Sequence, residues 1–345
     1  MNIRDKFMKK YLIFLIVVPL LVCCSCNDEL TSPLINIEIS DHILDKHFVT
    51  SIAFDSKGNA WIGTFNKGLI KYNGTTTHYD KTNSSLPDSL IIWSIAIDKN
   101  DYVWIGSDKG LIKYDHSKFI IYNKSNAPLF TNNVFALTID AENSIWFTSC
   151  MFRVGGIIKY DGMKWTAFTP QNSALPGSLM SDIIQDNQNN KWATINEGVN
   201  SVSIVKISGN SLRIYGEEEI GIRPYYFGNL ASGPNNHIYA SIDYSLSSVA
   251  DKNRPHILSF NGSNWTVNNP VDEKGESLGY VNKIAVDLMG NLWVSTSDYG
   301  IVVYNGKRWI YQKSNTRLEN WVYEMTVDKN NNIWIGSSDG IYIIK

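Results

Sequence analysis

Apolar and polar residues follow a pattern that repeats about every 45 residues from residue 51 to the end of the chain. Each repeat opens with a short apolar run that ends in aspartate or a turn residue, such as SIAFD at 51–55. A tight turn then leads into a second run, such as GNAWIGT at 58–64. Such runs predict β-strands, and each pair of runs predicts an antiparallel hairpin. The second run carries a central aromatic residue in each of seven copies: Trp61, Trp104, Trp146, Trp192, Tyr239, Trp293 and Trp334.

The typical repeat predicts two further strands. A glycine-led run such as GLIKYNG at 68–74 follows the tryptophan strand. Asn-Gly or Asp-Gly pairs, at 73–74, 161–162, 261–262 and 305–306, then mark a second hairpin. β-Branched and aromatic residues dominate, and no amphipathic helix of useful length occurs. Units of this kind are typical of propeller blades, so the chain is predicted to be an all-β, seven-bladed propeller of four-stranded blades.

The two ends of the repeat region predict how the ring closes. The last repeat stops after its third strand at 340–345, whereas residues 34–39 (LINIEI) form an apolar run before the first repeat. We expect residues 34–39 to be the outer strand of the seventh blade, because closing the ring removes two exposed sheet edges. The predicted domain therefore covers residues 34–345.

An aspartate ends the first strand in six of the repeats. It precedes a short turn, where an Asp side chain commonly caps backbone N–H groups. Equivalent positions of different blades are expected to lie far apart, so a turn role is favoured over a metal site. The six residues are Asp55, Asp98, Asp140, Asp186, Asp287 and Asp328.

Residues 1–25 have the pattern of a targeting segment. Four basic residues between positions 4 and 10 precede the apolar run at 11–22, which is too short to span a bilayer. The cysteine cluster that follows resembles a bacterial lipobox, with Cys26 as the lipid-attachment residue and Cys24 as the alternative. Residues 26–33 are then a polar tether, and the protein is expected to be a lipoprotein of the outer membrane, surface-exposed or facing the periplasm.

Composition narrows the choice of partners. The chain has 31 basic and 33 acidic residues, and the basic N-terminal segment holds several of the cations. The mildly acidic remainder argues against a nucleic-acid partner.

Outside the N-terminal cluster the chain has a single cysteine, Cys150. This predicts a buried thiol at a strand end and a fold held together without disulfides.

The repeat resembles that of the two-component regulator propeller family. The pattern D-x-x-G-N-x-W-I-G-T followed by G-L-x-x-Y is carried by 55–64 with 68–72, and the segments 98–114 and 328–342 are close copies. The resemblance implies a propeller of the kind found in the extracytoplasmic sensors of membrane histidine kinases, some of which sense polysaccharide fragments in gut Bacteroidetes. With one predicted ring and no kinase segment, this chain is expected to act as a stand-alone lipoprotein.

A ligand is expected on the face that bears the inter-blade segments and the loops between second and third strands. Aromatic side chains with a few polar groups on a rigid scaffold make a plausible recognition surface. The alternative is that each aromatic residue packs between blades. The candidate residues are Trp93, Phe152, Arg153, Tyr225, Tyr226, Tyr244, Arg254, Tyr280 and Trp321.

The predicted function is non-catalytic binding of a glycan, a peptide or an envelope protein. No metal-binding histidine spacing, nucleophile elbow or phosphate loop occurs in the sequence, so no metal, cofactor or catalytic residue is predicted. Two alternatives stay open: a polysaccharide lyase or hydrolase, and a structural subunit of an outer-membrane complex. Clustered carboxylates with perturbed pKa values in the central channel would favour the enzyme.

Overall fold

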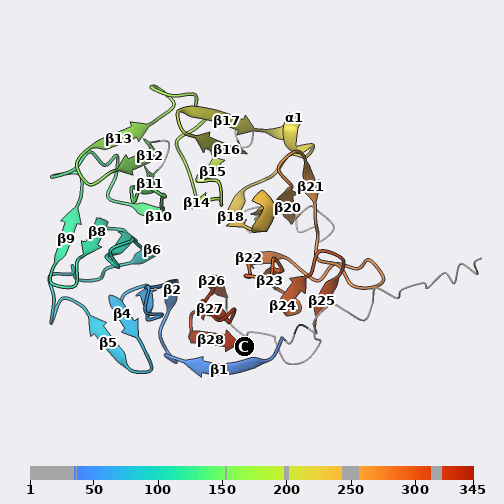
Figure 1. Cartoon of the computed structure of the whole chain (residues 1–345), viewed down its shortest axis with the longest axis horizontal. Helices are drawn as coiled ribbons and strands as arrows, with labels where there is room; N and C mark the ends of the chain where they lie inside the picture. The colour runs from blue at the N-terminus through green and yellow to red at the C-terminus, as the bar shows by residue number, and fades with distance from the viewer. Residues whose placement is uncertain (1–34, 36, 152–153, 198–201, 243–255, 312–320) are drawn as a thin grey trace, which may run out of the picture. The chain divides into compact units, whose positions relative to one another are not determined.

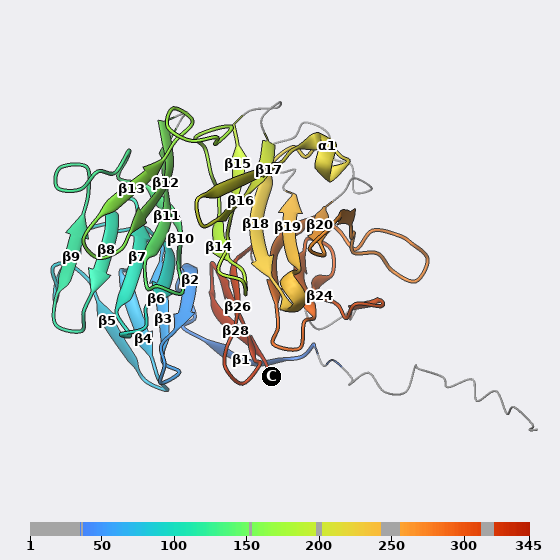
Figure 2. The same cartoon turned by 45° about the horizontal axis from the view of Figure 1, so that its top comes forward.

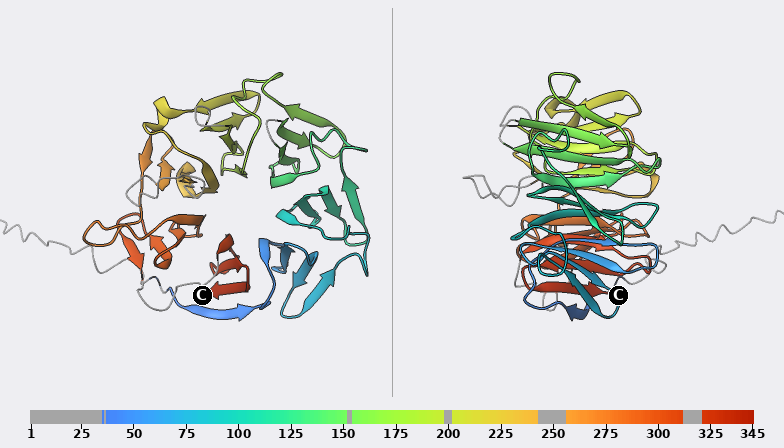
Figure 3. Two further views of the ribbon diagram at one scale, coloured as in Figure 1. Left: turned by 180° about the vertical axis from the view of Figure 1, so that it is seen from behind. Right: turned by 90° about the vertical axis from the view of Figure 1, so that its left-hand side faces the viewer.

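The computed structural model describes residues 35, 37–151, 154–197, 202–242, 256–311 and 321–345. Residues 36–345 form one compact unit. Within it, seven antiparallel four-stranded sheets follow one another around a ring in chain order (Figure 1; Figure 3, left). The predicted seven-bladed propeller is therefore confirmed. No helix among the described residues has the length and apolarity needed to cross a membrane.

The strands of each blade run from the centre of the ring outward in chain order. Blade 1 contains β2 (Val49–Phe54), β3 (Ala60–Thr64), β4 (Leu69–Tyr72) and β5 (Thr76–Tyr79). Blade 2 contains β6 (Ile92–Ile97), β7 (Val103–Ser107), β8 (Gly110–Tyr114) and β9 (Phe119–Tyr122). Blade 3 contains β10 (Val134–Ile139), β11 (Ile145–Met151), β12 (Val154–Tyr160) and β13 (Trp165–Phe168). Blade 4 contains β14 (Ile183–Gln185), β15 (Lys191–Asn196), β16 (Val202–Ser208) and β17 (Ser211–Tyr215).

The remaining blades follow the same order. Blade 5 contains β18 (Phe227–Ser232), β19 (Ile238–Ile242), β20 (Ile257–Phe260) and β21 (Trp265–Val267), and the short helices α1 (Glu217–Ile220) and η2 (Pro234–Asn236) lie beside it in sequence. Blade 6 contains β22 (Val281–Val286), β23 (Leu292–Thr296), β24 (Gly300–Tyr304) and β25 (Trp309–Tyr311). Blade 7 contains β26 (Val322–Val327), β27 (Ile333–Ser337) and β28 (Gly340–Ile344), completed by β1 (Ile39–Ile43).

The ring is closed by an N-terminal strand, as expected, but the strand begins five residues later than predicted. β1 pairs with β28 at the outer edge of blade 7 (Figures 1 and 2), with Ile39 opposite Ile344 and His42 opposite Tyr342. The ring of His42 stacks on Tyr342 at 4.2 Å. Polar residues therefore make many of the contacts between β1 and β28. The hydrophobic pattern of the sequence predicts 34–39 instead, because it does not detect polar contacts.

The hydrophobic core lies between neighbouring blades. The tryptophans of the second strands pack across inter-blade boundaries, as Trp61 of blade 1 does against Ile112 and Tyr114 of blade 2. Trp61 is completely buried, and Trp192 is 1% exposed. Because a single blade would leave both faces of its sheet in water, burial of these side chains requires the complete ring.

The aspartates at the ends of the first strands have the predicted turn role. One oxygen of Asp55 accepts the backbone N–H groups of Lys57 (3.1 Å) and Asn59 (2.9 Å). The other oxygen accepts the indole N–H of Trp61 at 3.1 Å, a contact that the sequence analysis did not anticipate. The same indole–carboxylate hydrogen bond recurs in blades 2, 3, 4, 6 and 7. Each aspartate thus joins a turn to the inter-blade core.

These carboxylates should make stability dependent on pH in the acid range. Burial raises the pKa of Asp55, Asp140 and Asp186, but the hydrogen bonds they accept lower it by more, so the net pKa is below the usual value. Their stabilising contribution is complete above the unfolded-state pKa of about 4 and is lost as pH falls through the lower folded-state values. We expect urea unfolding of Asp186→Asn to depend less on pH below about 4 than unfolding of the parent chain; equal dependence would contradict this.

Cys150 is confirmed as a buried thiol near the end of β11. Its side chain is completely buried and its Sγ lies 3.3 Å from the carbonyl oxygen of Met180. Burial raises the pKa of the thiol, so the nucleophilic thiolate is disfavoured.

Candidate functional site

The inter-blade segments and the loops between second and third strands lie on the same side of the ring, as expected. In blades 1, 2 and 6 the residue after the second strand donates its backbone N–H to the carbonyl oxygen of the residue that precedes the innermost strand, as Phe65 does to Phe48 at 3.0 Å. The same bond joins Asp108 to Ile91 and Ser297 to Tyr280. In blade 4 the last residue of the second strand, Asn196, donates in a similar way to Leu179. We call this side of the ring the loop face. The opposite side, which bears the aspartate turns, is the turn face.

The predicted site residues are spread around the loop face rather than gathered at one point. Tyr226, Tyr280 and Trp321 stand immediately before β18, β22 and β26, at equivalent positions of three blades, and Trp321 is 62% exposed. Tyr225 precedes Tyr226 and is 37% exposed. Trp93, the second residue of β6, is the candidate residue that lines the central channel. Phe152, Arg153, Tyr244 and Arg254 lie outside the described residues.

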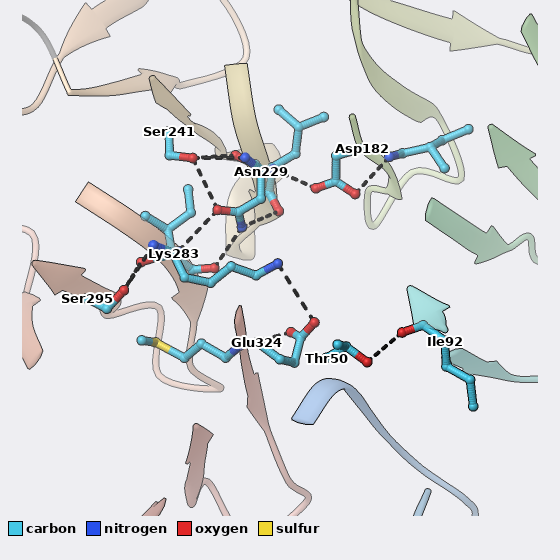
Figure 4. Close-up of polar contacts among 12 residues, drawn as sticks. Thr50, Ile92, Asp182, Asn229, Ser241, Lys283, Ser295 and Glu324 are labelled. Carbon is cyan, nitrogen blue, oxygen red and sulfur yellow. Dashed lines mark hydrogen bonds and ion pairs between the residues drawn. The ribbon is translucent and has the colours of Figure 1, made fainter. Parts of the chain in front are cut away.

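The innermost strands of all seven blades line a central cavity of 510 Å³. One residue per blade stands four positions before the turn aspartate or its equivalent, near the loop-face end of the strand. In blades 1 to 3 these residues are small, and in blades 4 to 7 they are polar or charged (Figure 4). In blade order they are Ser51, Ser94, Ala136, Asp182, Asn229, Lys283 and Glu324. We call the last four the channel cluster.

A backbone irregularity accompanies these positions. In six blades the register between the first and second strands shifts beside this position. Such a shift is typical of a β-bulge, which changes the direction in which nearby side chains point. In blades 3 to 6 a hydroxyl of the second strand accepts the backbone N–H of the residue, as Ser241 does from Asn229 at 2.9 Å. In blades 1, 2 and 7 that hydroxyl residue is replaced by Gly63, Gly106 or Gly336, where a Cβ would clash with a neighbouring side chain.

Asp182 and Asn229 connect neighbouring blades. Asp182 accepts the backbone N–H of Leu230 in blade 5 at 2.7 Å and that of Ile183 at 2.8 Å. The amide of Asn229 donates to the carbonyl oxygen of Ile284 in blade 6 at 3.0 Å. Burial raises the pKa of Asp182, while the charge of Lys283 and the two backbone N–H groups oppose the rise without cancelling it.

Lys283 and Glu324 form an ion pair between blades 6 and 7. The Nζ of Lys283 lies 3.8 Å from Oε2 of Glu324, and the two side chains are 23% and 19% exposed (Figure 4). The backbone N–H of Met325 donates to Oε1 of Glu324 at 3.0 Å. Burial raises the pKa of Glu324; Lys283 lowers it by less, and the negative charge of Asp182 adds to the rise.

Aromatic side chains stand on the other side of the channel. Trp93 and Phe135, from blades 2 and 3, line the cavity with their ring centroids 5.7 Å apart. On the loop face beside them, Phe48 contacts Tyr323 at 4.4 Å and Phe65 at 5.1 Å, and Phe65 and Tyr323 are each more than a third exposed. The channel thus has a polar wall and an aromatic wall, a combination suited to ligands that have both hydroxyl groups and apolar ring faces.

The channel cluster also meets the condition that would favour an enzyme. Two carboxyl groups with raised pKa values lie in one cavity beside an ammonium group, and such groups can act as proton donors and acceptors. No group of three or more metal-ligating side chains is present among the described residues.

Sequence reasoning missed the channel cluster, although a signal for it exists in the repeats. Alignment of the blades on the turn aspartate puts Asp182, Asn229, Lys283 and Glu324 at one offset. A charged residue or an amide at that offset of the inner strand distinguishes these blades from blades 1 to 3, which have serine or alanine there.

These features define a single-ring β-propeller with a polar central site. Three segments of the chain, residues 43–66, 85–109 and 316–339, match the family described as two component regulator propeller. Three of the seven repeats of this chain therefore match that family. The matched segments lie in or lead into blades 7, 1 and 2, whereas three of the four residues of the channel cluster come from blades 4, 5 and 6.

Known proteins share parts of this chain's sequence or its fold. Histidine kinase P4 of Formosa agariphila is 26% identical over 215 residues, which cover 58% of this chain and 15% of the kinase. The extracellular domain of a hybrid two-component system from B. thetaiotaomicron superposes with a TM-score of 0.67 at 18% identity, covering 89% of this chain and 39% of that one.

Two further similar structures have other roles. Virginiamycin B lyase from Staphylococcus aureus superposes with a TM-score of 0.66 at 14% identity, covering 89% of this chain and 96% of the lyase. PorZ, a surface component of the type-IX secretion system of Porphyromonas gingivalis, gives a TM-score of 0.67 at 18% identity, covering 87% of this chain and 46% of PorZ. At these identities the structures establish a shared fold, which by itself does not fix an activity.

Proposed function

We propose that this propeller is a non-catalytic binding module of the bacterial cell envelope that recognises the end of a glycan at the loop face. The observation that carries the proposal is the two-walled channel. The channel cluster offers donors and acceptors for hydroxyl groups, and Trp93 with Phe135 offers an apolar surface for a sugar ring. A cavity of 510 Å³ is within the range of small-ligand sites.

We propose that lipid on Cys26, or on Cys24, holds the protein at the envelope. Ile39 begins β1 opposite Ile344, the last residue of β28, so the chain joins the ring at the turn face. The similar structures from B. thetaiotaomicron and P. gingivalis, an extracellular domain and a surface component, are compatible with this placement in the envelope.

A thermal-shift and tryptophan-fluorescence screen of the mature protein against host and microbial oligosaccharides tests the proposal. A ligand that binds only the folded ring raises its unfolding midpoint. We expect Trp93→Ala to weaken binding at least about tenfold, because a stacked aromatic contributes about 1 kcal/mol or more beyond its buried area. Trp309→Ala, on the outer strand of blade 6, is the matched control and should keep the parent affinity. Equal affinity of Trp93→Ala would remove the site from the channel.

The enzyme alternative has a specific observation in its favour, namely the carboxyl groups of Asp182 and Glu324 with raised pKa values. Chromatography of each bound glycan after prolonged incubation distinguishes the two functions. Shortened products that disappear in Glu324→Gln would establish catalysis and refute a purely binding role. A screen in which no glycan binds would instead favour a structural subunit, to be sought by recovery of an envelope protein partner.

A further inference from the structure

The hydrogen bonds of the channel cluster show which kind of group is still available to a ligand. Both carboxylate oxygens of Asp182 accept a backbone N–H, from Ile183 and Leu230. Oε1 of Glu324 accepts the N–H of Met325. The amide of Asn229 both donates to Ile284 and accepts from the hydroxyl of Ser241 at 3.1 Å. Three of the four side chains in the cluster are thus largely engaged with the protein itself.

Lys283 differs from its neighbours. An ammonium group has three N–H donors. Its nearest anionic partner, Oε2 of Glu324, lies 3.8 Å away, which is longer than a hydrogen bond. Among the described residues, no acceptor lies within hydrogen-bonding distance of Nζ. The side chain is 23% exposed and lines the cavity, so its donors are open to a ligand (Figure 4).

On the basis of the proposed binding function, we propose that the channel selects a glycan with a carboxylate group, a uronic acid, which Lys283 binds. A carboxylate accepts charge-assisted hydrogen bonds from an ammonium group, which are stronger than the bonds of neutral hydroxyls. The rest of the sugar would lie against Trp93.

The charges in the cavity couple this binding to protons. The titratable residues that line it are Asp182 on β14, Lys283 on β22 and Glu324 on β26; β2, β6, β10 and β18 contribute uncharged side chains. A bound carboxylate adds a second net negative charge, which raises the pKa of Glu324 and Asp182 further. The protonated form of the site therefore binds the ligand better. Affinity should rise as pH falls through the raised pKa values of Asp182 and Glu324, with net uptake of protons.

Calorimetry with uronate trisaccharides of several stereochemistries, each beside its methyl ester, tests the inference on the mature protein. For a uronate that binds, we expect the acid to bind about tenfold or more tightly than its ester, since hydrogen bonds to charged groups are worth more than neutral ones. In Lys283→Gln the acid and the ester should bind equally, while Lys283→Arg should keep the preference. Titration in two buffers of different ionisation enthalpy should show proton uptake.

The possible results separate this inference from the function on which it rests. Equal affinity of acid and ester in the parent chain, or binding of neutral glycans alone, would overturn uronate selection and leave glycan binding intact. Affinity that rises with pH would also overturn it, because that direction indicates a cationic ligand. Failure of every acidic and neutral glycan to bind would refute the proposed function itself. Thermal unfolding of each variant verifies that the ring is intact.

Discussion

A chain that lacks residues 1–46 is expected to unfold about 8 °C below one that lacks only residues 1–33. The longer deletion removes β1 and leaves blade 7 with three strands, so the edge of β28 is exposed. It also removes Ile37, which is completely buried, and the half-buried Ile39 and Ile43. Full burial of an isoleucine contributes about 1.5–3 kcal/mol, so the loss amounts to about 5 kcal/mol.

Differential scanning calorimetry and size-exclusion chromatography measure this effect. The chain that lacks residues 1–33 is the control, because it keeps β1 and its pairing with β28. We also expect the longer deletion to associate in solution, since an unpaired strand edge binds other strands. A monomeric protein with an unchanged midpoint would show that the ring holds together without β1.

Asp186→Ala is expected to destabilise the propeller by about 3–5 kcal/mol, because it leaves several buried donors without an acceptor. The lost hydrogen bonds come from the N–H groups of Gln188 (2.9 Å) and Asn190 (2.9 Å) and from the indole of Trp192 (2.8 Å). Trp192 is 1% exposed, so no water replaces the carboxylate beside its indole. Asp186→Asn keeps one acceptor oxygen and should lose about half as much.

Urea unfolding measured by tryptophan fluorescence gives the free energies of these variants. Asp45→Ala, at an exposed position outside these networks, should change stability by less than about 0.5 kcal/mol. We expect the double variant Asp186→Ala with Trp192→Phe to be less destabilised than the sum of the two single changes, since the second change removes the orphaned indole donor. Additive effects would indicate that the indole–carboxylate bond does not couple the two residues.

Blade 5 lacks the hydrogen bond between a turn aspartate and an indole. Gly233 stands where the other blades have aspartate, and Tyr239 replaces the tryptophan. Both partners are absent together, so no indole donor is left unsatisfied. The turn keeps the backbone hydrogen bond that the other blades also have, with the N–H of Gly233 donating to the carbonyl oxygen of His237 at 2.8 Å.

The turn aspartates and the channel cluster are two sets of equivalent positions with different surroundings. The turn aspartates each cap their own blade, and the structure confirms that role. Four positions earlier in the same strands, Asp182, Lys283 and Glu324 face one cavity and interact across blades. Equivalent positions of a propeller therefore converge when they line the channel near its axis.

The sequence by itself determined the number of blades, the four strands of the typical blade, the closure by an N-terminal strand and the turn role of the aspartates. These features are local, because each follows from alternation, turn residues and a repeat within about 45 residues. Local pattern placed the closing strand at 34–39, whereas β1 is Ile39–Ile43. An outer strand is partly exposed, so polar contacts such as His42 with Tyr342 decide its register.

Only the tertiary structure decided where the candidate site lies. Asp182 and Glu324 belong to repeats that are separated in sequence by two other blades, and they share a cavity because the ring brings every innermost strand to the same axis. The burial that raises the pKa of both carboxyl groups depends on the neighbouring blades that surround the channel. The sequence repeat specifies the strands of each blade, whereas the residues of the channel cluster come together only in the closed ring.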